Sequence, residues 1–149
     1  MALVQGKEYP EHLYYDLENQ IWYEALPDAT IRAGFTPIAI ELAGEVLVFT
    51  PKRAGKPFEA QRSFATIECG KWVGAARAAF AGVVVASNPA LEARPKLLNE
   101  DAFRTGWMLI VRPDKADWNG ALLTGASVQA AFLNWIATDG YRSRADGSP

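Results

Sequence analysis

The chain has little of what disulfide frameworks, metal sites and membrane spans require. It contains one cysteine, Cys69, and one histidine, His12, among its 149 residues. A disulfide needs two cysteines, and a structural zinc site is built from several Cys or His ligands, so we expect neither within the chain. The best apolar stretch, Ala78 to Ala86, is interrupted by Gly82 and is far too short to cross a membrane.

A strong charge of one sign is also missing. Fifteen basic and seventeen acidic residues give a formal net charge of −2. Nucleic acids and anionic membranes attract basic surfaces, so this balance predicts neither as a partner. The N-terminus has no basic segment followed by a long apolar run, which would be typical of a secretory signal. We therefore expect a cytoplasmic protein.

The apolar residues occur in short runs bounded by Gly, Pro, Asn or charged residues, which is typical of strands. Several short strands between turns favour a mainly β fold, a sandwich or flattened barrel. The segment Thr36–Ala43 also fits a short helix with Pro37 in its first turn. The runs that we predict as strands are Ile38–Leu42, Glu45–Phe49, Phe64–Glu68, Gly82–Ala86 and Trp107–Val111.

Two of these strands lie in segments of similar sequence. Gly44–Pro51 and Gly82–Pro89 share Gly, Val and Pro at matching places. Such a repeat predicts two strand–turn–strand halves related by a two-fold axis. The chain would pass from one half to the other between Glu68 and Gly82.

We expect short helices around this β core. Asn99 is positioned to cap one turn that extends to Phe103. The range Ser127–Ala137 has apolar residues at helical spacing, with Ser127 as a possible N-cap and an end at Asp139-Gly140. Residues 1–140 would then form a single domain, and the polar segment 141–149 a flexible tail.

Lys71 lies at a reversal between two strand-like runs. Gly70 and Gly74 flank it and would permit tight-turn backbone angles. A lysine at a hairpin tip would hold its ammonium group in water, which is an ordinary solvated position when nothing else is considered.

The wider pattern resembles the H protein of the glycine cleavage system. Glu68-Cys-Gly-Lys71 stands where H proteins have Glu-Ser-Val-Lys, and Ala43-Gly-Glu-Val-Leu-Val-Phe49 resembles their Leu-Gly-Asp-Ile-Val-Phe-Val. Further matches run from about His12 to about Pro113. They include Asn88-Pro-Ala-Leu91, Pro95-Lys-Leu-Leu-Asn-Glu-Asp101 and Gly106-Trp107.

This resemblance implies a lipoyl-type fold and a carrier protein that is not itself an enzyme. Lys71 would hold lipoic acid in an amide bond, and the dithiolane of the arm would carry the transferred group between partner enzymes. Glu68, Gly70 and Trp72 would flank the attachment point. Glu68 would help a lipoate-attaching enzyme to recognise its target. Trp72 would either be half-buried by packing or form a platform for the arm or for a partner. An arm that visits several partners favours a monomer.

Other neighbours have two interpretations each. Cys69 could trap a lipoyl thiol, although a small residue filling a strand end is the preferred role. A second group could line the face that a loaded arm visits, or could serve the core and turns. This group is Asn99, Glu100, Asp101 and Trp107.

Three differences from H proteins point to another cargo. The acidic residue that H proteins commonly have at position 75 is replaced by Ala75, the net charge is nearly balanced, and a Trp-containing segment follows Pro113. These features resemble the lipoate-binding proteins of bacterial sulfur oxidation, which serve a heterodisulfide-reductase-like complex. We therefore predict sulfur as the cargo. The alternatives are an H protein carrying an aminomethyl group with the glycine cleavage enzymes, and an unlipoylated scaffold of the same fold.

Overall fold

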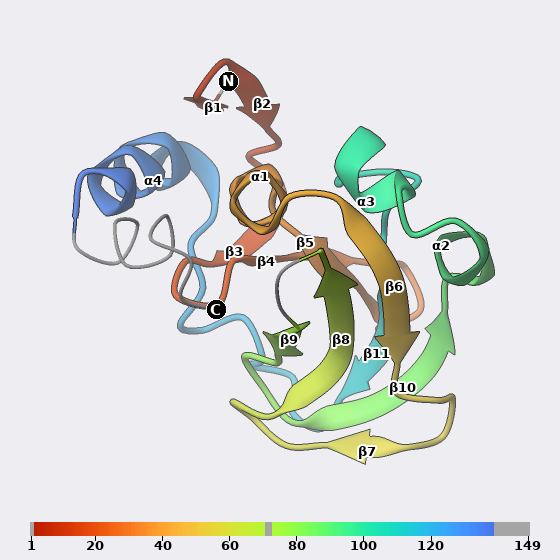
Figure 1. The fold of residues 1–149 in the computed structure, drawn as a ribbon. Coiled ribbons are helices and arrows are strands. Elements are labelled where there is room, and N and C mark those ends of the chain that lie inside the picture. The colour runs from red at the N-terminus through yellow and green to blue at the C-terminus, as the bar shows by residue number, and fades with distance from the viewer. Residues whose placement is uncertain (1, 71–72, 139–149) are drawn as a thin grey trace.

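Antiparallel sheets form the centre of the structure, a computed structural model that describes residues 2–70 and 73–138 (Figure 1). The largest sheet has six strands in the order β3-β4-β5-β11-β10-β7. These strands are β3 (Tyr14–Asp16), β4 (Ile21–Ala25), β5 (Ile31–Phe35), β7 (Pro57–Phe58), β10 (Gly82–Ser87) and β11 (Leu109–Pro113). A three-stranded sheet consists of β6 (Val46–Pro51), β8 (Ser63–Cys69) and β9 (Val73–Arg77), in that order.

The main core lies between these two sheets. Alternate residues of β8, namely Ala65, Ile67 and Cys69, are buried, and they join residues such as Tyr23 of β4 and Val111 of β11 in one hydrophobic cluster. This alternation is what a sheet with one face in the core requires. The predicted mainly β, sandwich-like fold is confirmed.

The internal repeat has a structural counterpart in two β-bulges. The register of β6 shifts between Val46 and Val48 against β8, and that of β10 shifts between Val84 and Ala86 against β11. These positions are equivalent in the two copies of the repeat. The copies lie in different sheets, which is the arrangement expected of two similar halves.

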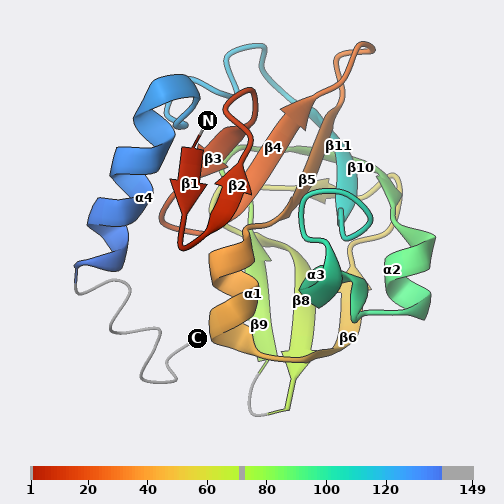
Figure 2. The same cartoon turned by 90° about the horizontal axis from the view of Figure 1, so that it is seen from above.

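The sequence did not predict the strands before residue 36. Ile21 and Tyr23 of β4 face the main core, while Trp22 between them lies in a second cluster on the outer side. A strand buried on both faces shows no alternation, so its pattern carries little information. The second cluster is covered by the hairpin of β1 (Ala2–Val4) and β2 (Lys7–Tyr9) and by the helix α4 (Val128–Ile136), which lie side by side in Figure 2.

The segment after β5 is the helix α1 (Pro37–Ala43), so its interpretation as a strand over Ile38–Leu42 is wrong and the alternative is confirmed. Thr36 accepts a hydrogen bond from the Ala39 amide through its hydroxyl, which is a standard N-cap contact. Gly44 ends the helix with φ of 83°, a conformation that favours glycine.

The remaining helices are short, and two of the predicted helix caps are wrong. Asn99 lies inside α3 (Leu97–Glu100) and does not cap a following turn. The predicted C-terminal helix is present as α4, preceded by a 3₁₀ turn (Gly125–Ser127), but the Ser127 hydroxyl donates to the Thr124 carbonyl and makes no capping bond. The fourth helix is α2 (Pro89–Ala93), capped by Asn88. The predicted helix end at Asp139-Gly140 and the tail 141–149 lie outside the described residues.

Within the described ranges, no helix combines the length and the hydrophobicity that crossing a membrane requires.

Three buried tyrosines make the stability of the fold sensitive to alkaline pH. Burial raises the pKa of Tyr9, Tyr15 and Tyr23 above its ordinary value. An unfolded chain ionises these phenols at about pH 10 while the folded chain keeps them neutral, so stability is full below that pH and falls as the pH rises above it. We expect the tyrosinate absorbance of these three residues to appear together with the loss of circular dichroism. Ionisation of all three within a folded protein would contradict this prediction.

Candidate functional site

The hairpin of β8 and β9 places the segment that contains Lys71. Glu68 pairs with Val73 across the two strands, β8 ends at Cys69 and β9 begins at Val73, so residues 70–72 connect them. Lys71 and Trp72 themselves lie outside the described residues. The strands on either side confirm a reversal at this point of the chain, at one end of the three-stranded sheet.

The two glycines near Lys71 have different positions in the structure. Gly70 is exposed but its φ is not in the left-handed region, and a Cβ added to it would meet no atom within 4 Å. Gly74 lies inside β9, where it is buried and pairs with Ile67. The interpretation of Gly74 as a turn residue is therefore wrong, while Gly70 lies in a bend directly after β8. Gly70 leaves open space beside the connection, and Gly74 belongs to the sheet.

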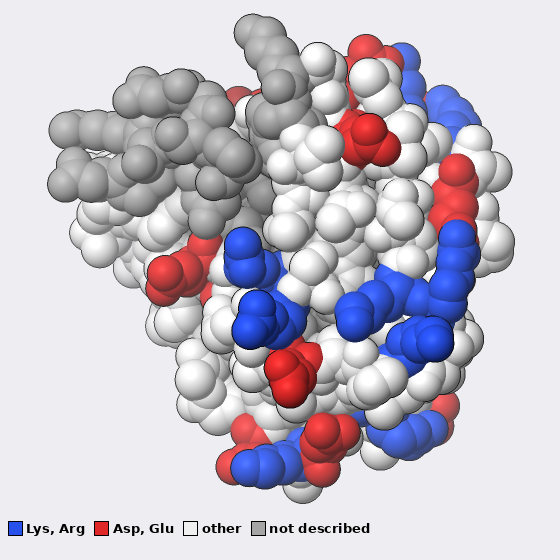
Figure 3. Space-filling view, turned by 60° about the horizontal axis from the view of Figure 1, so that its bottom comes forward, with Lys and Arg blue, Asp and Glu red and all other residues white. Residues whose placement is uncertain are grey.

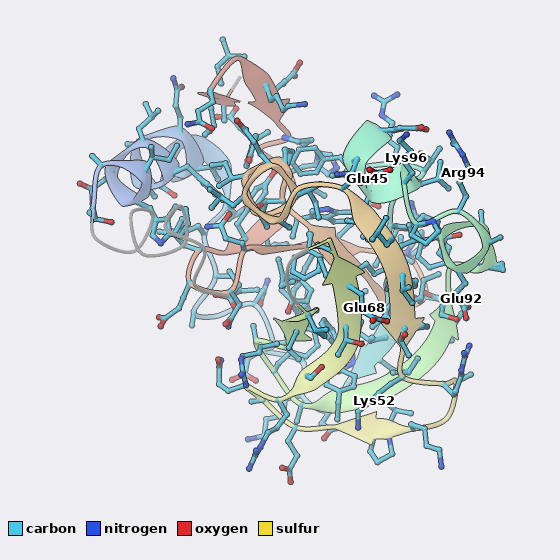
Figure 4. All side chains as sticks on the ribbon, viewed as in Figure 1. Glu45, Lys52, Glu68, Glu92, Arg94 and Lys96 are labelled. Atoms are coloured by element: carbon cyan, nitrogen blue, oxygen red, sulfur yellow. The ribbon has the colours of Figure 1, made fainter. Side chains whose placement is uncertain are left out.

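Glu68 points outward from β8. Its two neighbours across the strands are Val48 on β6 and Val73 on β9. Its carboxylate makes no hydrogen bond or ion pair with any residue that the structure describes, and Figure 4 shows it projecting from the sheet. A carboxylate that lies between two valines and has no partner among the described residues can pair with a basic group of another molecule.

Cys69 has the opposite orientation. Its side chain is buried in the main core, across the sheet from Val46, and burial raises the pKa of its thiol. A thiol reacts through its thiolate form, which burial disfavours. The structure agrees with the packing role of Cys69 and gives no support to its trapping a lipoyl thiol.

Asn99 ties the loop before β6 to α3. Its amide nitrogen donates to the Gly44 carbonyl over 2.8 Å, and its oxygen accepts from the Val46 amide over 3.0 Å. Val46 pairs with Cys69, so this contact fixes the start of β6 beside the hairpin end.

Removing the Asn99 side chain is expected to destabilise the protein. In Asn99→Ala, the buried Val46 amide loses its acceptor and the Gly44 carbonyl loses its donor, which should cost about 1–2 kcal/mol of unfolding free energy. Urea unfolding measures this loss. Asn134, exposed on α4, is the control, and its change to Ala should alter stability by less than about 0.5 kcal/mol. Equal effects of the two substitutions would contradict the role of Asn99.

The other candidates for an arm-contacting face have local partners. Glu100 forms an ion pair with Arg94, and Asp101 accepts hydrogen bonds from the Thr105 amide and hydroxyl. Trp107 lies outside this region, with the Arg32 guanidinium 5.8 Å from its ring centre. Trp107 is therefore not brought together with the hairpin by any contact among the described residues.

Asn99, Glu100 and Asp101 do line a hollow of about 610 Å³ between α1, α3 and the β1-β2 hairpin. Its charged lining is mostly acidic, because Glu8 and Glu41 add two further carboxylates and Lys7 one cation. Gly44, just before β6, also lines the hollow. The hollow therefore lies at the end of β6 that adjoins the β8-β9 hairpin.

Sequence reasoning missed the apolar residues around Glu68. Leu47, Val48 and Val73 are all exposed large hydrophobic residues. The pair Leu47-Val48 was a possible signal, because two consecutive apolar residues in a strand with one buried face imply either an interruption or an outward apolar side chain.

Comparison with known proteins places this arrangement in a family. The sequence profile described as "Glycine cleavage H-protein" matches residues 13–134. The chain is 36% identical over 143 residues to "Glycine cleavage system H protein 5" of Aquifex aeolicus, covering 93% of this chain and 96% of that protein. It is 33% identical to "Probable glycine cleavage system H protein 2" of Sulfurisphaera tokodaii, covering 93% and 95%.

A solved structure agrees with these matches. The crystal structure of a glycine cleavage system H protein from Mycobacterium marinum superposes with a TM-score of 0.73 and 27% identity, covering 85% of this chain and 99% of that one. The profile match spans well over half of the chain, and the two named relatives are matched over nearly their whole length. The chain belongs to the glycine cleavage H-protein family.

Proposed function

We propose that this protein is a lipoyl carrier and that Lys71 holds lipoic acid in an amide bond. Glycine cleavage H proteins are carriers, not enzymes, and hold lipoate on a lysine. The observation that carries the proposal for this chain is the position of Lys71, between the paired residues Glu68 and Val73. The described strands on either side of it, β8 and β9, meet at one end of the three-stranded sheet.

The chemistry of attachment suits a lysine in this position. The neutral Nζ atom attacks the carbonyl carbon of an activated lipoyl group, such as an acyl-adenylate. A carbon–nitrogen bond forms, the bond to the leaving phosphate breaks, and the nitrogen releases a proton. The amide that results is uncharged, so the arm can enter an apolar site without desolvating an ammonium group. Catalysis belongs to the partner enzymes, and the carrier supplies the arm at a high local concentration.

For the cargo, we propose the aminomethyl group of glycine cleavage. The named relatives are described as glycine cleavage system H proteins, which supports this reading over the sulfur reading that the sequence suggested. The acidic hollow at the hairpin end of β6 also favours a cargo that bears a positive charge, as a protonated amine does. The partners would then be a lipoate-attaching enzyme and the glycine cleavage enzymes.

Sulfur carriage is the second candidate, and the outer face of β9 favours it. Ala75 is exposed and pairs with Thr66, so this part of the hairpin has no carboxylate at the position where H proteins commonly have one. Sulfur bound to a dithiolane has no ammonium group to balance, and a face without that acid suits it. The partner in this case would be a heterodisulfide-reductase-like complex. We also expect a monomeric protein in the cytoplasm for either cargo.

Intact mass and peptide mapping of the protein from its native host test the attachment. The expected result is one lipoyl mass increment on the peptide that contains Lys71. An unmodified Lys71 in cells that lipoylate other proteins would overturn the proposal and would favour the scaffold alternative.

A transfer assay then separates the two cargoes. The lipoylated protein is supplied to glycine decarboxylase and aminomethyltransferase with glycine. Turnover at the rate of an ordinary H protein supports aminomethyl carriage. Absence of turnover, together with sulfur bound to the reduced arm after exposure to a sulfane sulfur donor, would support sulfur carriage instead.

A further inference from the structure

Four exposed side chains at the hairpin end of the three-stranded sheet form a continuous strip. We call Leu47, Val48, Glu68 and Val73 the tip strip. Val48 lies opposite Glu68, and Glu68 lies opposite Val73, so three of the four stand in one row across the sheet. Directly paired residues have Cβ atoms about 5 Å apart, so the row forms one contact surface.

The fourth member is exposed because of the β-bulge. Val46 pairs with Cys69 and Val48 with Glu68, so Leu47 is the extra residue of the bulge in β6. In a regular strand Leu47 and Val48 would point to opposite faces. Here Leu47 is 53% exposed and Val48 is 41% exposed, and both contribute apolar surface next to Glu68. Bulges commonly re-aim side chains near functional sites.

The strip is limited to the hairpin end. Farther along the same strands the outward residues are Thr50 on β6 and Thr66 on β8, which pair with each other. Figure 3 shows an uncharged stretch on this side of the molecule, with Lys and Arg side chains gathered along its lower edge. The exposed basic residues at that end are Lys52, Arg53, Lys56, Arg62 and Arg77.

The position of the strip selects which partner must cover it. Val73 is two residues after Lys71, so their Cα atoms lie within about 7 Å of each other. An enzyme that forms the amide must bring its acyl donor into bonding distance of Nζ, at the end of a four-carbon stem. Its surface therefore comes against the neighbours of Lys71. A partner that uses the finished arm works farther from the backbone, because the lipoyl chain adds reach.

We infer that the tip strip is the docking surface for the enzyme that acylates Lys71, and that this enzyme presents an apolar patch with a basic side chain opposite Glu68. The inference rests on the proposed lipoylation of Lys71. The charge of the partner follows from Glu68, the single charged member of the strip and a carboxylate that has no ion pair among the described residues. The three apolar members exclude water around that contact, which strengthens it.

Lipoylation kinetics test this inference. The probe is a lipoate–protein ligase from the host, supplied with lipoate and ATP, with the product measured by intact mass. We expect Val48→Asp and Val73→Asp each to lower kcat/KM about tenfold, mainly through KM, because a charge then faces the apolar patch of the enzyme. Melting temperatures show whether the fold is intact. The isosteric variant Val73→Thr serves if an Asp variant fails to fold, with a smaller loss expected.

Val85→Asp is the matched control. Val85 is 41% exposed, like Val48, and is the bulge residue of β10 at the position equivalent to Leu47 in the repeat. It lies in the other sheet, so the same substitution should leave kcat/KM unchanged. Comparable losses in Val85→Asp and Val48→Asp would overturn the inference.

A competition experiment separates docking from chemistry. A Lys71→Arg chain cannot be acylated and should inhibit lipoylation of the wild-type chain competitively. Adding Val48→Asp to this competitor should raise its inhibition constant about tenfold, which equals about 1.4 kcal/mol of binding. If wild-type protein is never lipoylated, the proposed function itself fails. If it is lipoylated and the strip variants match the control in rate and inhibition, only the docking inference fails.

Discussion

Lys71→Arg is expected to remove the lipoyl group entirely and to reduce carrier activity to background. Arginine keeps the length and the positive charge of lysine, but its guanidinium remains protonated at all working pH values and is a poor nucleophile. No amide can therefore form at position 71. Intact mass after incubation with the ligase, lipoate and ATP should show no increment, and partner enzymes should show no transfer with the variant.

Two other lysines serve as controls for this result. Lys52 directly follows β6 and donates to the Pro57 carbonyl, and Lys96 pairs with Glu45, which directly precedes β6. Figure 4 shows the two lysines at opposite ends of β6. Lys52→Arg and Lys96→Arg should be lipoylated like the wild-type chain. A lipoyl increment that persists in Lys71→Arg and is lost in either control would move the attachment site away from the hairpin.

Strands of both main sheets could be predicted from the sequence where they have one buried face. β8 and β10 lie within a residue or two of the predicted ranges. The repeat was also readable, although its strongest sign, the bulge at equivalent positions of β6 and β10, appears only in the strand registers. A bulge depends on which strand pairs with which, and this information is not local to either segment.

The N-terminal third of the fold was not predictable in the same way. β4 is buried on both faces, and the residues that cover its outer face come from the N-terminal hairpin and from α4, far away in sequence. The pattern of such a strand depends on contacts that only the tertiary structure reveals. The helix α1 was ambiguous because its apolar run fits the spacing of a helix and also that of a strand. Only the Thr36 cap and Gly44 at its end decide for the helix.

The site was predictable in part. Lys71 and Glu68 came from the resemblance to a family, and the strand pairing agrees with a reversal there. The apolar neighbours of Glu68 were not foreseen, because Val48 is distant in sequence and is brought beside Glu68 only by the register of β6. Gly74 was misread for the opposite reason: its position next to a turn suggested a turn residue, while the pairing with Ile67 makes it part of β9.

Trp22→Ala is expected to be the most destabilising single substitution in the second cluster. The indole is fully buried, its Nε1 donates to the Ala102 carbonyl over 3.0 Å, and its ring packs on Gly34 and near Phe103. Replacing it with Ala removes the largest side chain of this layer and leaves a cavity, which should cost about 3–5 kcal/mol. Urea unfolding measures the loss. Trp118→Ala is the control, since Trp118 is only partly buried and should cost clearly less.

Gly34 provides a sharper test of the same contact. A Cβ at this position would lie 2.6 Å from Cζ2 of Trp22, closer than real Cβ contacts. Gly34→Ala should therefore destabilise the wild-type protein, and it should cost much less in the Trp22→Ala background, where the ring is absent. A double-mutant cycle should give a coupling of about 1–3 kcal/mol. Additive effects would show that Gly34 is required for its backbone alone and that the ring does not determine the residue at position 34. A clear coupling would instead link the burial of Trp22 to the close approach of β4 and β5 under the N-terminal layer.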